Sequence, residues 1–171
     1  MNRGRRGVWN PSYLLKLSTM ALPHDAEMTS AVPLDTILTG APRATSGPSS
    51  TVCDGAIDVV NGISPPPATV MLGGILAVEG WTAVSASAGI APDETFVTLS
   101  SADGRRLYVK ARTMPRVDVK QHFLHPDMPD AGFTAFVDVS KLRGEYGLGL
   151  SRVYKGQLEH CQFSVPLRIS E

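Results

Sequence analysis

The amino-acid sequence predicts an all-β fold, an antiparallel sandwich of about seven strands with one short helix. From residue 53 onward, short segments alternate apolar and polar side chains, and Gly and Pro separate these segments. The 16 Gly and 13 Pro of the 171 residues, with only 6% aromatic residues, favour many turns over long helices. The clearest alternation closes the chain, where single residues separate Cys161, Phe163, Val165, Leu167 and Ile169.

Composition and charge limit the classes of protein to which the chain can belong. A hydrophobic content of 43% is enough for one domain with a core. The formal net charge of zero argues against nucleic-acid binding, which normally requires a basic excess. The longest apolar run, 70–78, has about half of the ~20 residues that a membrane-spanning helix needs. We therefore expect no nucleic-acid partner, no membrane span in this chain and no convincing export signal.

Residues 1–52 differ from the rest and are predicted to form a disordered or weakly helical N-terminal segment. The stretch 36–51 is rich in Gly, Pro, Ser and Thr and has few large apolar side chains. Such a stretch buries too little surface to offset its ordering entropy, so it is interpreted as a linker. A helical turn or two is expected within 9–22. The folded domain is expected to span 53–171.

The first two strands of the domain are separated by turn residues. Ile57 and Val59 belong to the first, which ends at Asn61-Gly62 and a run of three prolines. The central strand lies within 71–83. Gly80 is predicted to mark a bulge that turns Trp81 into the core, because Trp81 would otherwise share a face with Glu79.

The remaining elements follow in order. Segments 96–100 and 107–112 form the clearest hairpin, around the turn residues Asp103-Gly104. Segment 115–123 is predicted as one or two helical turns, on which Val119 and Phe123 lie at i and i+4. Strands are then expected around 133–139, 146–150 and 161–169.

Cys53 and Cys161 are the two cysteines, and both fall in phase with inward-facing residues of the first and last strands. One interpretation is a disulfide that ties these strands together, which would stabilise the fold by about 4 kcal/mol in the chain-entropy model and imply an oxidising compartment. The alternative is two separate thiols.

Four residues are candidates for ligand binding. Arg112, Arg116 and Asp118 flank Met114-Pro115, and an Arg–Asp pair can bind a sugar hydroxyl or an anion because a guanidinium suits planar acceptors. Tyr108 is predicted to face outward, where it can stack on a sugar ring, whereas Trp81 is assigned to the core. The alternative is structural: Asp118 caps the short helix and Arg116 pairs with it.

No motif predicts catalysis, a cofactor or a metal site. No Gly-x-Ser-x-Gly elbow precedes a helix, and Gly73-Gly74 and Gly147–Gly149 lie in strands rather than in a phosphate loop. The spacing of His122, His125 and Asp127 suits a divalent metal, but a zinc site needs three or four convergent ligands and no fourth is evident. Solvated loop histidines are the preferred interpretation.

Several of these motifs occur together in one order, which makes the series more specific than any single motif. They are Cys53–Asp58 with Asn61-Gly62, Leu76–Trp81, Pro115–Val119, Gly132-Phe133 and Leu142–Tyr146, followed by Cys161. Over 53–171 the chain resembles an immunoglobulin-like module at the C-terminus of bacterial polytopic membrane proteins related to envelope-polysaccharide glycosyltransferases. The chain departs from the family's Arg-Pro-Asp-Val motif at one position, where Val117 replaces Pro. This difference implies a less rigid loop.

The resemblance implies that transferase chemistry belongs to a membrane-embedded part and that this chain carries only the accessory module. We expect a non-catalytic, immunoglobulin-like β-sandwich in the periplasm or cell envelope, contacting envelope glycan or a polytopic membrane transferase. One alternative is a purely structural packing domain that binds no sugar. Another is a small metal-dependent hydrolase that uses the two histidines and Asp127.

Overall fold

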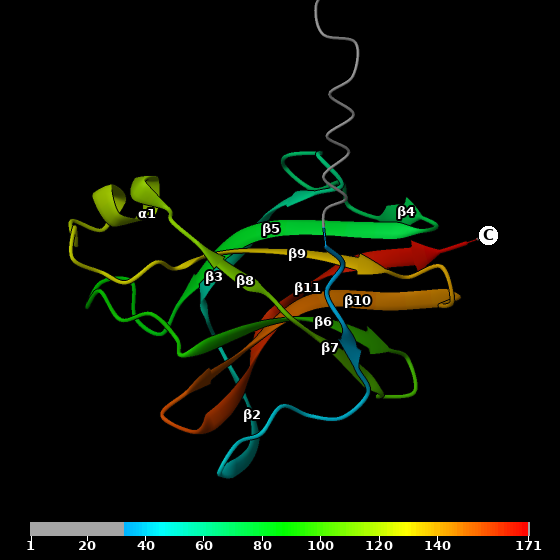
Figure 1. Cartoon of the computed structure of the whole chain (residues 1–171), viewed down its shortest axis with the longest axis horizontal. Helices are drawn as coiled ribbons and strands as arrows, with labels where there is room; N and C mark the ends of the chain where they lie inside the picture. Colours follow the sequence, from blue (N-terminus) through cyan, green and yellow to red (C-terminus); the bar gives the residue numbers. More distant parts are fainter. Residues whose placement is uncertain (1–32, 171) are drawn as a thin grey trace, which may run out of the picture. The chain divides into compact units, whose positions relative to one another are not determined.

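The computed structural model describes residues 33–170, which form strands and one helix (Figure 1). The helix is α1 (Val117–His122). The strands in this range are β1 (Ile37–Leu38), β2 (Ser46–Thr51), β3 (Asp54–Val60), β4 (Val70–Leu72), β5 (Ile75–Ala83), β6 (Glu94–Ser101), β7 (Arg106–Lys110), β8 (Arg112–Met114), β9 (Gly132–Asp138), β10 (Gly144–Tyr154) and β11 (Gln157–Ile169).

The strands form two sheets. One has the order β1-β7-β6-β10-β11-β2, with β4 also paired to β11, and the other has the order β3-β5-β9-β8. Pairing is antiparallel except for β2 and β4, which run parallel to β11. In chain order, β3-β5-β9-β8 and β6-β10-β11 correspond to the ABED and CFG sheets of an immunoglobulin-like sandwich, with β7 added beside β6. The predicted fold class is confirmed, with more strands than the seven expected.

Side chains that alternate along the strands fill the space between the sheets. Because successive side chains of a strand point to opposite faces, every second residue enters this core. The predicted 96–112 hairpin places alternate residues in this core: Val97, Leu99 and Val109 are fully buried, and Leu107 packs against them. The core also contains Leu76, Val78, Phe133, Ala135, Val137, Leu148, Leu150, Leu167 and Ile169.

Trp81 does not lie in this core, so that prediction is wrong. β5 pairs with β9 in unbroken register through Gly80, so Trp81 shares the outer face of its sheet with Glu79. The indole is half-buried there against a small cluster that includes Val119 and Phe123. The irregularity lies in the neighbouring strand β3, where Asp58 is the extra residue between Ile57 and Val59.

Phe133, rather than Trp81, is the large aromatic side chain in the core at this point of the sheet. It lies opposite Gly80 in the β5–β9 pair and is only 1% exposed. A Cβ atom on Gly80 would lie 2.1 Å from the carbonyl oxygen of Ala56 and 2.8 Å from Cζ of Phe133. Gly80 is therefore needed for the close approach of β3 and of this ring, and not for a bulge.

The predicted linker 36–51 is also corrected, because it contains two strands. β1 pairs with β7 at one edge of the larger sheet, and β2 pairs with β11 at the other. Edge pairing satisfies backbone donors and acceptors and does not require large apolar side chains, so composition alone did not reveal it. The helical turns expected within 9–22 lie outside the described residues.

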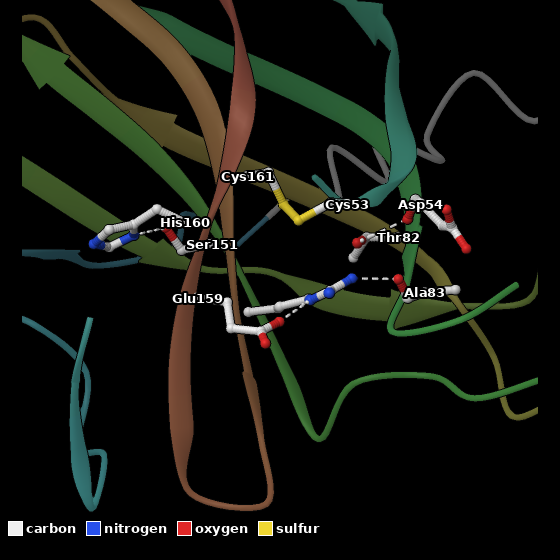
Figure 2. Close-up of a disulfide and its surroundings, with 9 residues drawn as sticks. Cys53, Asp54, Thr82, Ala83, Ser151, Glu159, His160 and Cys161 are labelled. Atoms are coloured by element: carbon white, nitrogen blue, oxygen red, sulfur yellow. Dashed lines mark hydrogen bonds and ion pairs between the residues drawn. A yellow bond between two sulfur atoms is a disulfide. The ribbon is translucent and has the colours of Figure 1, made fainter. Parts of the chain in front are cut away.

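A disulfide joins the two sheets (Figure 2). Cys53 immediately precedes β3, and Cys161 lies in β11, 108 positions further along the chain. The predicted disulfide is confirmed over the alternative of separate thiols. His160 points away from the disulfide, on the opposite face of β11, as strand alternation requires (Figure 2).

A partly buried ion pair lies close to the disulfide and was not predicted. Arg152 is only 3% exposed and is in phase with the core residues Leu148 and Leu150. Its Nε donates to a carboxylate oxygen of Glu159 at 2.7 Å, and its Nη1 donates to the carbonyl oxygen of Ala83 on the opposite sheet (Figure 2). The guanidinium therefore links the two sheets by hydrogen bonds near the point where the disulfide links them covalently.

Across residues 33–170, no helix is long and apolar enough to cross a membrane.

Candidate binding site beside the short helix

The structure does not bring the four predicted ligand-binding residues together. Tyr108 is only 5% exposed, and its ring packs edge-on against Phe96 and 6.0 Å from the His160 ring. Alternation correctly places Tyr108 outside the inter-sheet core, but neighbours on the same outer face cover it. Tyr108 therefore has no open face on which a sugar could stack, and its assignment as a surface residue is wrong.

Arg112 holds the chain segment before β1. Its Nε donates to Oδ1 of Asp35 at 3.0 Å, and its Nη2 donates to the carbonyl oxygen of Pro33. The other carboxylate oxygen of Asp35 accepts a hydrogen bond from the backbone N–H of Phe136 on β9, at 2.8 Å. The guanidinium of Arg112 is thus engaged in anchoring this segment to the sandwich.

Arg116 and Asp118 do lie together. Nε and Nη2 of Arg116 donate to the two carboxylate oxygens of Asp118 at 2.8 and 2.6 Å, which is bidentate pairing. Nη1 donates to Asp58 at 2.6 Å, and Asp58 is the extra residue of the β3 bulge. The expected Arg116–Asp118 pairing is confirmed. The expected cap is wrong, because α1 has no side-chain cap and Asp118 lies in its first turn.

A hollow of about 320 Å³ lies beside this ion-pair network. It is lined by Trp81, Arg116, Asp118, Val119, His122 and Phe123. The Trp81 and Phe123 ring centroids are 5.6 Å apart, and His122 meets Phe123 edge-on at 4.8 Å. One signal in the sequence could have identified Trp81 as a residue of this hollow, namely that it shares a strand face with Glu79. The same shared face is the basis of the predicted bulge.

The hollow combines the two kinds of surface that a sugar ring requires. One face of a sugar ring carries C–H groups that pack on an aromatic ring, and its rim carries hydroxyls that donate and accept hydrogen bonds. Trp81 and Phe123 provide the aromatic surface, and Asp118 provides acceptor lone pairs. Arg116 has five N–H donors, of which the two carboxylates use three. The volume is at the lower end of the range of ligand sites.

The charges of the network reinforce one another. Hydrogen bonding to Arg116, together with its positive charge, lowers the pKa of Asp118 from its usual 3.8 to about 2. The same hydrogen bond to Asp118, with that to Asp58, raises the pKa of Arg116 above its usual value. At neutral pH the hollow therefore presents a fixed, fully ionised acceptor–donor pair.

We expect the Asp118 carboxylate to be half protonated only at about pH 2, its lowered pKa. Because its folded-state pKa is depressed, the stability that this ionisation adds is present in full above pH 3.8 and is lost as the pH falls through about 2. NMR titration of the side-chain carboxyl carbon measures this pKa. In an Arg116→Gln variant, the midpoint should rise toward 3.8, because the largest cause of the lowered pKa is removed; an unchanged midpoint would show that Arg116 does not control it.

The three residues considered for metal binding do not form a site. Nε2 of His125 lies 2.5 Å from the carbonyl oxygen of Ser87, so that ring is engaged with the backbone. His122 lies at the hollow against Phe123. In the described part of the chain, no three His, Cys, Asp or Glu side chains are grouped to hold a metal ion.

Comparison of the chain with protein-family models, curated proteins and solved structures finds no match.

Proposed function

We propose that this protein is a non-catalytic accessory β-sandwich module of a bacterial cell-envelope system, associated with a membrane glycosyltransferase and in contact with its polysaccharide. The observation that carries the glycan contact is the hollow beside α1, where the half-buried indole of Trp81 adjoins the Arg116–Asp118 pair. An aromatic face beside fixed hydrogen-bonding groups suits a sugar ring and requires no cofactor.

The disulfide supports a location in the periplasm. Disulfides form and persist in oxidising compartments and are rare in the reducing cytosol. Cys53 and Cys161 close a long loop and join the two sheets, so this disulfide is part of the architecture of the sandwich.

The chemistry of the hollow supports binding rather than catalysis. A general acid or base works best when its pKa is near the operating pH. Asp118, with a pKa of about 2, holds no proton to donate at neutral pH and is a poor base. Arg116 is held as a cation by two carboxylates. Both groups can orient hydroxyls without taking part in proton transfer.

A second candidate function, packing against a membrane transferase without sugar binding, is favoured by a different observation. Val117 on α1 is 60% exposed, and Leu124 just beyond it is 84% exposed. With Lys120, Gln121 and Pro126 they line a hollow of about 560 Å³. Exposed apolar side chains gathered around one hollow are typical of a protein contact.

A glycan array probed with the full chain separates the two functions. We expect binding to envelope polysaccharides that weakens in Asp118→Asn and His122→Ala, both of which alter the hollow at exposed positions. Asp127→Asn is the matched control, because this exposed carboxylate lies in the following loop and does not line the hollow. If no envelope polysaccharide on the array binds, the proposed glycan contact is overturned and the packing function is favoured.

A further inference from the structure

A groove runs along β10 on the outer face of the larger sheet. Leu148 and Leu150 point from β10 into the core, so Gly147 and Gly149 lie on the opposite face and contribute no side chain. The flanking strands place side chains in register beside these glycines: Thr98 and Ser100 from β6, and Ser164 and Pro166 from β11. The backbone of β10 is the floor of the groove, and the side chains of β6 and β11 are its walls.

The groove consists of two adjoining hollows of about 330 and 520 Å³, which share Ser100 and Gly147. The smaller hollow ends at His160, whose Nδ1 lies 2.7 Å from the hydroxyl of Ser151. The larger hollow extends to Glu145 and Arg168, which face each other across the β10–β11 pair. The shape is elongated and open, which suits a chain-like ligand better than an enclosed small molecule.

The lining of the smaller hollow is polar and carries a cation. Its side chains include the hydroxyls of Ser50, Thr98, Ser100 and Ser164, the amide of Gln162 and the guanidinium of Arg106. Nε of Arg106 donates to the Ser100 hydroxyl at 3.1 Å, which directs the guanidinium to the wall of the groove. Among residues 33–170, no carboxylate forms a salt bridge with Arg106, unlike Arg116 in the hollow beside α1.

The backbone of the groove excludes one class of ligand. A peptide that binds by extending a sheet needs a free edge with unpaired N–H and C=O groups. β10 is paired with β6 along the whole floor and with β11 at Gly147 and Gly149, up to a register shift between Gly149 and Ser151. Recognition in this groove must therefore rely on the side chains of its walls. These offer hydroxyls and an amide, the cations Arg106 and Arg168, and the carboxylate of Glu145 at the far end of the larger hollow.

We propose that this groove binds a saccharide chain that carries carboxylates. One carboxylate pairs with Arg106, and the sugar hydroxyls exchange hydrogen bonds with the wall hydroxyls and Gln162, while the chain lies over Gly147 and Gly149. The groove is built by strands of the sheet opposite to the one that carries Trp81. The inference rests on the proposed function only in that the ligand of the groove and the ligand of the hollow beside α1 are both glycans.

Titration of the full chain with a trimer of galacturonic acid tests this, with a neutral galactose trimer as the control ligand. We expect the acidic trimer to bind and the neutral trimer to bind at least tenfold more weakly. Arg106→Gln should weaken binding of the acidic trimer about tenfold, because it removes a hydrogen-bonded ion pair. Arg105→Gln is the matched control and should bind like the unmodified protein, because Arg105 is exposed in the turn and pairs with Asp103.

Gly147→Val fills the groove at its floor. A Cβ atom on Gly147 would lie 3.4 Å from Cβ of Ser164, an ordinary contact, and the two γ-methyl groups of valine would extend beyond it, so we expect the variant to fold and lose binding. Equal binding of the acidic and neutral trimers, or equal binding by the Arg106 and Arg105 variants, would overturn the proposal whether or not the Gly147 variant folds. If the acidic trimer does not bind, while binding on the glycan array still depends on Asp118, the proposal for the groove is overturned and the proposed function stands.

Discussion

Replacing both cysteines, as Cys53→Ala with Cys161→Ala, is expected to lower the free energy of unfolding by about 4 kcal/mol. The disulfide spans 108 positions, so it removes a large loop-closure entropy from the unfolded chain. It also joins β11 to the start of β3, and these strands belong to different sheets. We expect the variant to fold with a lower unfolding midpoint, because the buried residues of the core cluster, against which Cys161 packs, are unchanged.

Urea unfolding of the oxidised protein, the reduced protein and the double variant measures this effect. The reduced protein and the variant should share one lowered midpoint, and the midpoint of the variant should not respond to reductant. Coincident midpoints for the oxidised protein and the variant would show that the covalent link adds nothing to the stability of the sandwich.

Arg152→Ala is expected to lower the free energy of unfolding by about 3 kcal/mol, the lower end for breaking a buried ion pair, because Arg152 is buried and Glu159 is 20% exposed. Glu159 would lose the hydrogen bond that Nε of Arg152 donates at 2.7 Å. The carbonyl oxygen of Ala83 would lose its donor as well. An exposed ion pair would lose far less, since surface salt bridges contribute about 0 to 1 kcal/mol.

A combined Arg152→Met and Glu159→Leu variant is the control for this effect. Replacing both partners of a buried pair with apolar side chains of similar size is often neutral, so we expect it to recover most of the loss. Both variants are compared by urea unfolding. If the double variant is as unstable as Arg152→Ala, the loss arises from the link to Ala83 and from packing, and not from an unpaired Glu159.

Much of the sandwich was predictable because one face of most strands is buried. Period-two alternation correctly identified the buried faces of 96–100, 107–112 and 161–169, since burial of one face selects apolar side chains at every second position. The short helix was predicted from the i, i+4 spacing of Val119 and Phe123. The disulfide was one interpretation of the two cysteines, because both are in phase with inward-facing residues of their strands.

Trp81 and Tyr108 show where alternation is insufficient. Both point away from the inter-sheet core, and only their neighbours decide how exposed they are. Trp81 is half-buried against Phe123 and lines a hollow, whereas Tyr108 is covered by Phe96 and His160. Period alone gives the side of a sheet on which a residue lies, but not what covers that side.

The candidate sites were less predictable than the fold. Arg116 and Asp118 are two positions apart, so their pairing was open to sequence reasoning, but Asp58 joins them from another strand through a bulge. The floor of the groove consists of two glycines, which contribute no side chain for a motif to identify. Arg106 can be identified as a residue of the groove only from its position beside Ser100 across the β6–β7 pair.

The sequence by itself determined the all-β class and the approximate extents of the main strands, and it allowed a disulfide between the two cysteines as one of two interpretations, because each depends on local periodicity and burial. Only the tertiary structure decided the edge strands β1 and β2, the exchange of Trp81 for Phe133 in the core, and the positions of both candidate binding sites. These features depend on which strands are neighbours and on how closely backbones approach, as at Gly80, and such contacts join residues far apart in the chain.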